Sequence, residues 1–442
     1  MPSPRSIRPL LLLILPVCSI SYAEMMPEDS FPALGEILLH LDESSPAIAA
    51  EAMRIEESQA SYEAAASASM PRVSSYARIQ GQYETRFNSE ADNINSFDVG
   101  PYASINASLP IYRWGEIQAR KDQALGRKES ATAWTERRKA DLRQNIRRFY
   151  IEYQLALQAA TIASEGISYA KNKEEGMRAM LESGNTSRRS VYEAQIYAQE
   201  RMEELTDCES RSVYYLDLLR EASGRPQLEI PLEAIPMIEP LEEEQLAALQ
   251  QAAANQDSEE TLAIEGELAT ESAYNKELGT RNKPKIDAVL SSNLDYVDEY
   301  RSGGDYENVP RINSWIGLQA NWQIYDGGGI RAEQRASMAR VRRLEARIAE
   351  ARLRHLREAS SAAREARLNA SRIETRAARL AMLEDSIRLM EAQLASGSTP
   401  ANDLFQRKLD LERTRVDLLR ACAYYTLYIA ELREMATPFS SQ

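Results

Sequence analysis

The sequence has only two histidines and three cysteines among 442 residues, which leaves few residues for a metal centre or a catalytic thiol. Basic residues are also few, 53 against 67 acidic ones, and the net charge of −14 argues against nucleic acid as a partner because phosphate binding needs a basic surface. No apolar run approaches the roughly 18 residues that a membrane-spanning helix needs. A membrane β-barrel stays open, since its strands alternate in polarity.

Catalytic motifs are missing as well. The sequence contains no nucleophile–base pair, no glycine-rich phosphate loop followed by lysine, and no cluster of metal ligands. We therefore expect no catalytic residue, no cofactor and no metal site, and a protein that is not an enzyme. His355 lies within a charged helical stretch, where we expect a solvated surface position.

The N-terminus has the pattern of an export signal. Arg5 and Arg8 precede an apolar stretch at 10–15, and Ser21-Tyr22-Ala23 places small residues where a signal peptidase cuts. Residues 1–23 are predicted to be removed. Cys18 leaves lipid attachment open as an alternative, although Val17 stands where a small residue is usual.

The rest of the chain is one unit written twice. Matching residues recur 213 positions apart, as in Pro71 and Pro284, Tyr112 and Tyr325, Gly115 and Gly328, Gly184 and Gly397, and Leu219 and Leu432. One gapless offset over so long a stretch indicates a duplicated domain rather than a short-period array. We place the first repeat at 24–221, a proline-rich extended linker at 222–243, the second repeat at 244–435 and a tail at 436–442.

Each repeat is predicted to hold a helix and then two strands, at 72–86 and 97–110 in the first and at 285–300 and 312–325 in the second. Apolar and polar residues alternate along all four segments, so each strand has one apolar and one polar face. Segments of about ten such residues match tilted strands that cross a bilayer. A soluble antiparallel sheet with one face on a core is the alternative.

A long helical hairpin is predicted to follow the strands of each repeat, at 115–221 and 329–434. Proline is absent from 115–180 and from 330–395, and helices of this length need a partner helix to be stable. A glycine, Gly184 or Gly397, ends the first arm of each hairpin. Alanine is frequent along the thin apolar stripe, which allows close helix packing.

Four strands cannot close a barrel, and an open edge in lipid leaves unsatisfied backbone groups at several kcal/mol each. Two copies would give eight strands and a filled interior, whereas three would give twelve strands and a pore. The predicted fold is therefore mainly α with a membrane β-barrel part: a homotrimer whose twelve-stranded barrel continues into an α-helical tunnel.

These motifs, in this order and spacing, resemble the TolC-like outer-membrane efflux family over nearly the whole mature chain. The segments Ser108–Gly115 and Asn321–Gly328 look like the strand-to-helix junction of the family, with Tyr112, Gly115, Tyr325 and Gly328 at the turn. The segments 181–187 and 395–399 look like its hairpin tips. The resemblance implies a barrel in the outer membrane, in contact with its lipid, and a tunnel in the periplasm.

The resemblance also implies partners and sites. A periplasmic adaptor would dock at the tips, and an inner-membrane pump would supply the energy. The tip residues are Gly184, Asn185, Thr186, Gly397, Ser398 and Thr399. Asp403 and Gln406 stand at the positions of the periplasmic constriction, where family members carry acids; Asp403 keeps the acid, and Gln406 departs from this pattern. Asp403 can also be read as an acid that stabilises a helix N-terminus.

The expected function is the exit duct of a tripartite efflux or type I secretion system. Small molecules, proteins or metal ions are all compatible with the sequence, because the pump is expected to choose the cargo. The alternative is a periplasmic coiled-coil scaffold or adhesin without a pore.

Overall fold

The computed structural model describes residues 26–86, 94–300, 306–395 and 401–437. The predicted signal at 1–23 lies outside this range and stays a prediction. The described chain forms two compact units, and each takes segments from both repeats. Unit 1 holds residues 26–41, 143–253, 359–395 and 401–436, and unit 2 holds 42–86, 94–142, 254–300, 306–358 and 437.

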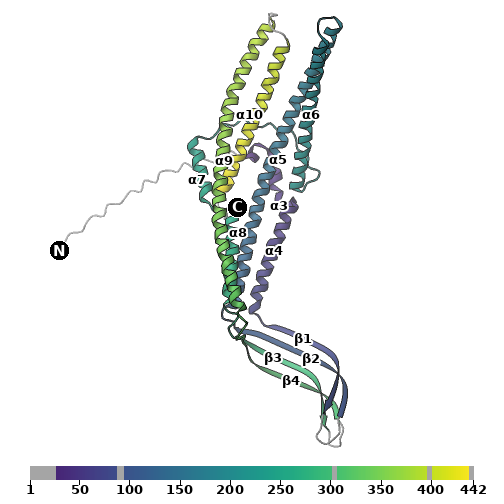
Figure 1. Ribbon diagram of the computed structural model, residues 1–442, viewed down its shortest axis with the longest axis vertical. Helices are drawn as coiled ribbons and strands as arrows, with labels where there is room; N and C mark the ends of the chain where they lie inside the picture. Colours follow the sequence, from purple (N-terminus) through teal and green to yellow (C-terminus); the bar gives the residue numbers. More distant parts are fainter. Residues whose placement is uncertain (1–25, 87–93, 301–305, 396–400, 438–442) are drawn as a thin grey trace, which may run out of the picture. The chain divides into compact units, whose positions relative to one another are not determined.

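Unit 2 contains one four-stranded antiparallel sheet in the order β1-β2-β3-β4 (Figure 1). The strands are β1 (Arg72–Arg86), β2 (Ile94–Tyr112), β3 (Lys285–Tyr300) and β4 (Tyr306–Asn321). Two of them differ from the predicted ranges: β2 begins at 94, and β4 runs from 306 to 321. Because β4 pairs residue for residue with β3, it ends at Asn321, opposite Lys285, the first residue of β3.

In a soluble protein the apolar face of a sheet is buried and the polar face is exposed. In this sheet the exposure of the two faces is reversed. The apolar side chains of Ile79 and Ile316 are 80% and 81% exposed. On the opposite face, Ser104 and Ser291 are only 6% and 5% exposed, and the Ser291 hydroxyl donates to Asn106 Oδ1 at 2.7 Å. The alternation predicted from the sequence is present, but within this chain no helix covers the apolar face of these described strands.

The helices of unit 2 are α4 (Pro46–Ala66), the short η2 (Ser67–Ser69), α8 (Glu259–Leu278), and the sheet-proximal parts of α5 (Glu116–Glu182) and α9 (Gly329–Ala395). Ile264 of α8 packs with Leu344, Ile348 and Ala351 of α9. His355 continues this stripe and is 6% exposed, so its predicted surface position is wrong. The spacing of four residues from Ala351 places it on the buried side of the helix.

Helices α5 and α8 cross at two glycines. A Cβ atom on Gly126 would lie 2.7 Å from Thr270 Oγ1 and 2.9 Å from the Gly266 carbonyl oxygen. A Cβ atom on Gly266 would lie 2.6 Å from the Ser130 nitrogen. The obstructing atoms are mostly backbone, which cannot turn aside as a flexible side chain can. Only glycine allows this approach.

Unit 1 is helical. It contains α1 (Pro27–Ser30), α2 (Pro32–Leu39), the distal parts of α5 and α9, α6 (Arg188–Ser223) and α10 (Ala401–Ala436), with most of α7 (Glu243–Asn255); α3 (Leu41–Ser44) starts where the two units divide. Alanines of α9 and α10 dominate its core, together with Tyr425 and Leu418. Arg147 is buried there and bonds Glu28 at 2.8 and 3.0 Å and Glu434 at 2.7 Å.

The proline-rich segment between α6 and α7 is extended, and it lies on the helices of unit 1. Gln154 donates to the Pro231 carbonyl at 2.8 Å and accepts from the Glu233 amide at 3.0 Å. The Tyr150 hydroxyl donates to Glu233 Oε2 at 2.6 Å, and the Leu241 amide donates to the Tyr425 hydroxyl at 2.7 Å. The segment is therefore a fixed strap on α5 and α10, a name we keep below.

Across the described residues, none of the helices combines the length and the apolar character required to span a membrane.

Alanine at Gly126 or Gly266 is expected to destabilise the protein by about 1 to 3 kcal/mol, because the new methyl group forces α5 and α8 apart. Thermal unfolding followed by circular dichroism measures the effect. Gly176→Ala, on α5 with open space around its Cβ position, is the matched control and should be neutral or stabilising by up to about 1 kcal/mol. Equal unfolding midpoints for Gly126→Ala and Gly176→Ala would contradict the close crossing.

Candidate functional site

The strand-to-helix junctions contain two successive residues in the left-handed conformation in each repeat. Trp114 and Gly115 have φ of 54° and 84°, and Gly327 and Gly328 have 70° and 90°. These positions are equivalent through the 213-residue offset. Two such residues turn the chain from the last strand into the long helix, so the predicted glycines Gly115 and Gly328 lie at the turn itself.

Trp114 occupies a conformation that a side chain with a Cβ atom rarely adopts. Three contacts hold it there. Its indole nitrogen donates to the Pro284 carbonyl at 2.7 Å, its ring meets Tyr112 edge-on at 4.9 Å between centroids, and the Lys283 ammonium lies 5.2 Å above the ring. Tyr112, one of the predicted junction residues, thus supports the turn through Trp114.

The second junction relies on Asp326 instead. Its carboxylate accepts the backbone N–H groups of Gly328 at 2.9 Å and Ile330 at 2.5 Å, which caps the start of α9. These hydrogen bonds lower the pKa of Asp326. Tyr325 is 84% exposed. Sequence reasoning missed Asp326, although an acid just before a long helix is a recognisable cap signal.

A chain of charges connects the first junction to β3 and α8. Arg113 pairs with Asp287 at 2.6 Å, and Lys285 pairs with Glu116 at 2.8 Å. Arg120 bridges two buried carboxylates, Glu116 at 2.6 Å and Glu277 at 3.2 Å. Gln123 also donates to Glu277, at 2.8 Å. Each buried acid therefore has a cation beside it, which offsets the cost of burying its charge.

The tip of the first hairpin is a tight, exposed turn. Gly184 has φ of 77°, and the Asn185 amide donates to the Met180 carbonyl at 2.8 Å, which closes the end of α5. The Ser187 hydroxyl accepts the Ser190 amide at 3.3 Å and starts α6. Asn185 is exposed and Thr186 half-buried, so polar groups lie on the surface of this tip. Gly397, Ser398 and Thr399 of the second tip lie outside the described residues.

The two predicted constriction residues lie on the first turns of α10. Asp403 belongs to this helix, but its side chain is outside the described part. Gln406 is half-buried. The helical spacing of three places the two residues on neighbouring positions of one face.

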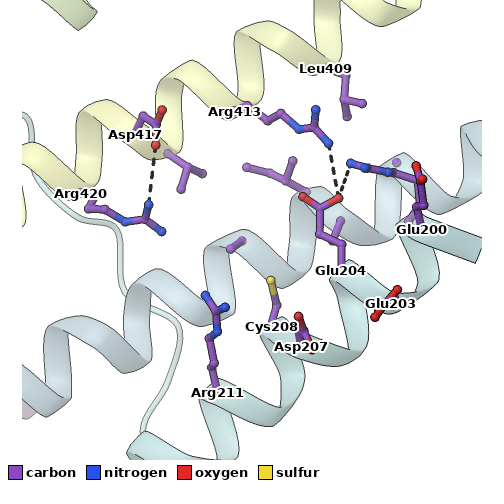
Figure 2. Close-up of a pocket in the computed structure, with 16 residues that line it drawn as sticks. Glu200, Glu203, Glu204, Asp207, Cys208, Arg211, Leu409, Arg413, Asp417 and Arg420 are labelled. Carbon is purple, nitrogen blue, oxygen red and sulfur yellow. Dashed lines mark hydrogen bonds and ion pairs between the residues drawn. The ribbon is translucent and has the colours of Figure 1, made fainter. Parts of the chain in front are cut away.

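A cavity of about 550 Å³ opens between α5, α6 and α10 within unit 1 (Figure 2). Its charges largely satisfy one another: Glu204 receives both Arg201 and Arg413, and Asp417 pairs with Arg420 at 3.7 Å. Cys208 lines the cavity, and burial raises the pKa of its thiol, which is therefore protonated at neutral pH. Within the described ranges, no group of three or more His, Cys, Asp or Glu residues is placed to hold a metal ion.

Asp326→Ala is expected to lower the thermal unfolding midpoint at pH 7, because α9 loses its N-terminal cap. The folded-state pKa of Asp326 is depressed, so its contribution to stability is present above the unfolded-state pKa of about 4 and is lost as the pH falls through the folded value. The difference from wild type should therefore shrink in acid. Asp326→Asn, which retains one acceptor oxygen, is the control and should lose less. A midpoint difference that stays constant between pH 7 and pH 3 would contradict this role.

Known proteins with a similar sequence or fold are outer-membrane proteins. Residues 40–225 match the family described as outer membrane efflux protein. No curated protein sequence matches the chain. Its fold is similar to that of the MtrE outer membrane channel of Neisseria gonorrhoeae, at 15% identity and a TM-score of 0.72 over 98% of this chain and 97% of that one.

Two further solved structures share the fold. The outer membrane protein VceC of Vibrio cholerae matches at 14% identity and a TM-score of 0.71, over 92% of this chain and 97% of that one. The CmeC outer membrane channel of Campylobacter jejuni matches at 12% identity and a TM-score of 0.67, over 91% and 85%. The family and these neighbours are outer-membrane proteins and channels, not enzymes. The chain therefore shares the fold of these solved outer-membrane proteins over nearly its whole length, and its residues 40–225 are similar to the outer membrane efflux protein family.

Proposed function

We propose that three copies of this chain form the exit duct of an export system, with a twelve-stranded barrel in the outer membrane and a helical tunnel in the periplasm. The observation that carries the proposal is the reversed sheet, whose apolar face is open while Ser104 and Ser291 of the opposite face are covered. Lipid against Ile79 and Ile316 explains an exposure that water would disfavour.

Closure of the sheet sets the copy number. β1 and β4 are its edges, and their outer backbone groups need partners in lipid. Pairing β1 of one copy with β4 of the next supplies them. Three copies give twelve strands around an open pore, whereas two would give a filled eight-stranded barrel. A pore-free periplasmic scaffold would leave the apolar face in water, and the family match also favours the duct.

A passive duct has no energy source of its own, so the proposed function requires partner proteins. An inner-membrane pump would drive small molecules or proteins into the tunnel, and a periplasmic adaptor would seal the joint. We assign adaptor docking to the exposed first tip at Gly184, Asn185 and Thr186, together with Gly397, Ser398 and Thr399 of the second. The exposed polar side chains of Ser183, Asn185 and Ser187 support this assignment.

Outer-membrane fractions are expected to contain the protein, and native mass measurement in detergent should show three chains per particle. Heating before electrophoresis should shift its migration, as barrel unfolding does. A monomer in the soluble periplasmic fraction would defeat the proposal.

Asp403 is assigned to the periplasmic constriction, where three copies would form an acidic ring. Such a ring attracts cations and narrows the pore. Asp403→Asn, which removes the charge at nearly constant shape, should weaken block by Mg²⁺ and raise the conductance of single channels in planar bilayers. Asp403→Glu keeps the charge and is the control that should retain block. If Asp403→Asn gave the wild-type record, Asp403 would be only an N-terminal acid of α10.

A further inference from the structure

Two helices of unit 2 continue the edge strands of the sheet. α4 leads through η2 into β1, and α9 follows β4. Any copy that pairs its β4 edge with the β1 edge of the next therefore brings α9 beside the neighbour's α4. α4 runs toward the sheet and α9 runs away from it, so the two helices would lie antiparallel.

The face of α9 that points away from its own core is basic. Leu344, Ile348 and Ala351 mark the buried stripe. Arg335 and Arg342 lie on the opposite side at helical spacing and are exposed. Neither forms an ion pair within the described chain. Met338 and Ala346 lie exposed on the same side, so the face combines unpaired cations with apolar and small residues.

The outward face of α4 has the opposite charge. Glu56 and Glu63 are exposed, and neither has a cationic partner among the residues that the structure describes. Glu63 accepts a hydrogen bond only from the neutral Gln59, at 2.7 Å. Ala49, Met53 and Ala60 complete the face, and all three are exposed. Small side chains here would let another helix approach closely.

The two faces also agree in register when each is counted from the helix end that adjoins the sheet. Glu63 lies six residues before Ser69, where η2 ends, and Arg335 lies six residues after Gly329, where α9 starts. Glu56 and Arg342 lie thirteen residues from the same two points. At 1.5 Å per residue these are heights of about 9 and 20 Å. Ala60 and Met338, nine residues away in each case, place a large side chain opposite a small one.

We infer that the α4 face of one copy docks on the α9 face of the next, with Glu63 beside Arg335 and Glu56 beside Arg342. The partner is a second copy of this chain, and the inference rests on the proposed trimer. Charged pairs of this kind fix register and exclude wrong neighbours more than they add affinity. This contact between α4 of one copy and α9 of the next, which we call the seam, would therefore select copies of this chain during assembly.

Charge reversal tests the seam. Glu56→Arg with Glu63→Arg, or Arg335→Glu with Arg342→Glu, places like charges together and should raise the dissociation constant of the trimer at least about tenfold at low salt. The fourfold variant that carries both changes restores opposite pairs and has the wild-type composition of charges, so it is the matched control and should return to the wild-type value. Native mass measurement over a dilution series in detergent reads the result.

Cysteine cross-linking tests the register. In a Cys208→Ser, Cys422→Ala background, Ala60→Cys with Met338→Cys should form a disulfide between copies when oxidised by copper phenanthroline. Ala64→Cys with Met338→Cys is shifted by four residues, about 6 Å, beyond the reach of a disulfide, and should not. Reducible dimers and trimers on denaturing gels are the readout.

The outcomes separate the seam from the duct. If the wild-type protein is a trimer and neither charge reversal changes its dissociation constant, the α4–α9 contact is wrong, but the proposed duct is not contradicted. The same holds if neither cysteine pair cross-links. Equal cross-linking of both cysteine pairs overturns the register. A wild-type monomer overturns the proposed function itself. Reversals that fail to fold are recognised because the fourfold variant then folds while its two components do not.

Discussion

The open edges of a four-stranded sheet are the constraint on which the rest of the molecule depends. Backbone N–H and C=O groups along β1 and β4 must find partners wherever water is absent, and one chain cannot provide them. The apolar face adds a second demand, since Ile79 and Ile316 are open in the isolated chain. In the proposed trimer a membrane would meet the second demand and identical neighbours the first. The long helices would then continue from strands whose positions the ring has fixed.

Duplication produced two junctions that solve one problem by different means. Both repeats use two left-handed residues in succession, yet the first has Trp114 where the second has Gly327. The first position is held by contacts to Pro284, Tyr112 and Lys283, whereas the second needs none because glycine adopts the conformation freely. The residues before them, Arg113 and Asp326, have also diverged: one pairs with Asp287 across the sheet, and the other caps α9.

Patterns with a fixed period were readable in the sequence, and contacts between distant segments were not. Alternation located all four strands, and proline-free runs located α5 and α9. The end of β4 was misplaced because pairing with β3, rather than its own alternation, decides where it stops. His355 was misplaced because charged neighbours hid its position on the buried stripe. The bridge from Arg120 to Glu277 and the cavity around Cys208 join residues of different repeats, which no local pattern reveals.

The strap has a consequence for the symmetry of the assembly. Two similar repeats per chain would let three chains imitate a ring of six equal parts. The strap occurs once per chain, where Gln154 grips Pro231 and Glu233 and Tyr425 holds Leu241, and it joins a helix of one repeat to a helix of the other. Around such a ring, the boundary between the two repeats of one chain would be crossed by the strap. The boundary between repeats of different chains would not be. In the proposed trimer the helices around the ring would therefore follow threefold and not sixfold symmetry.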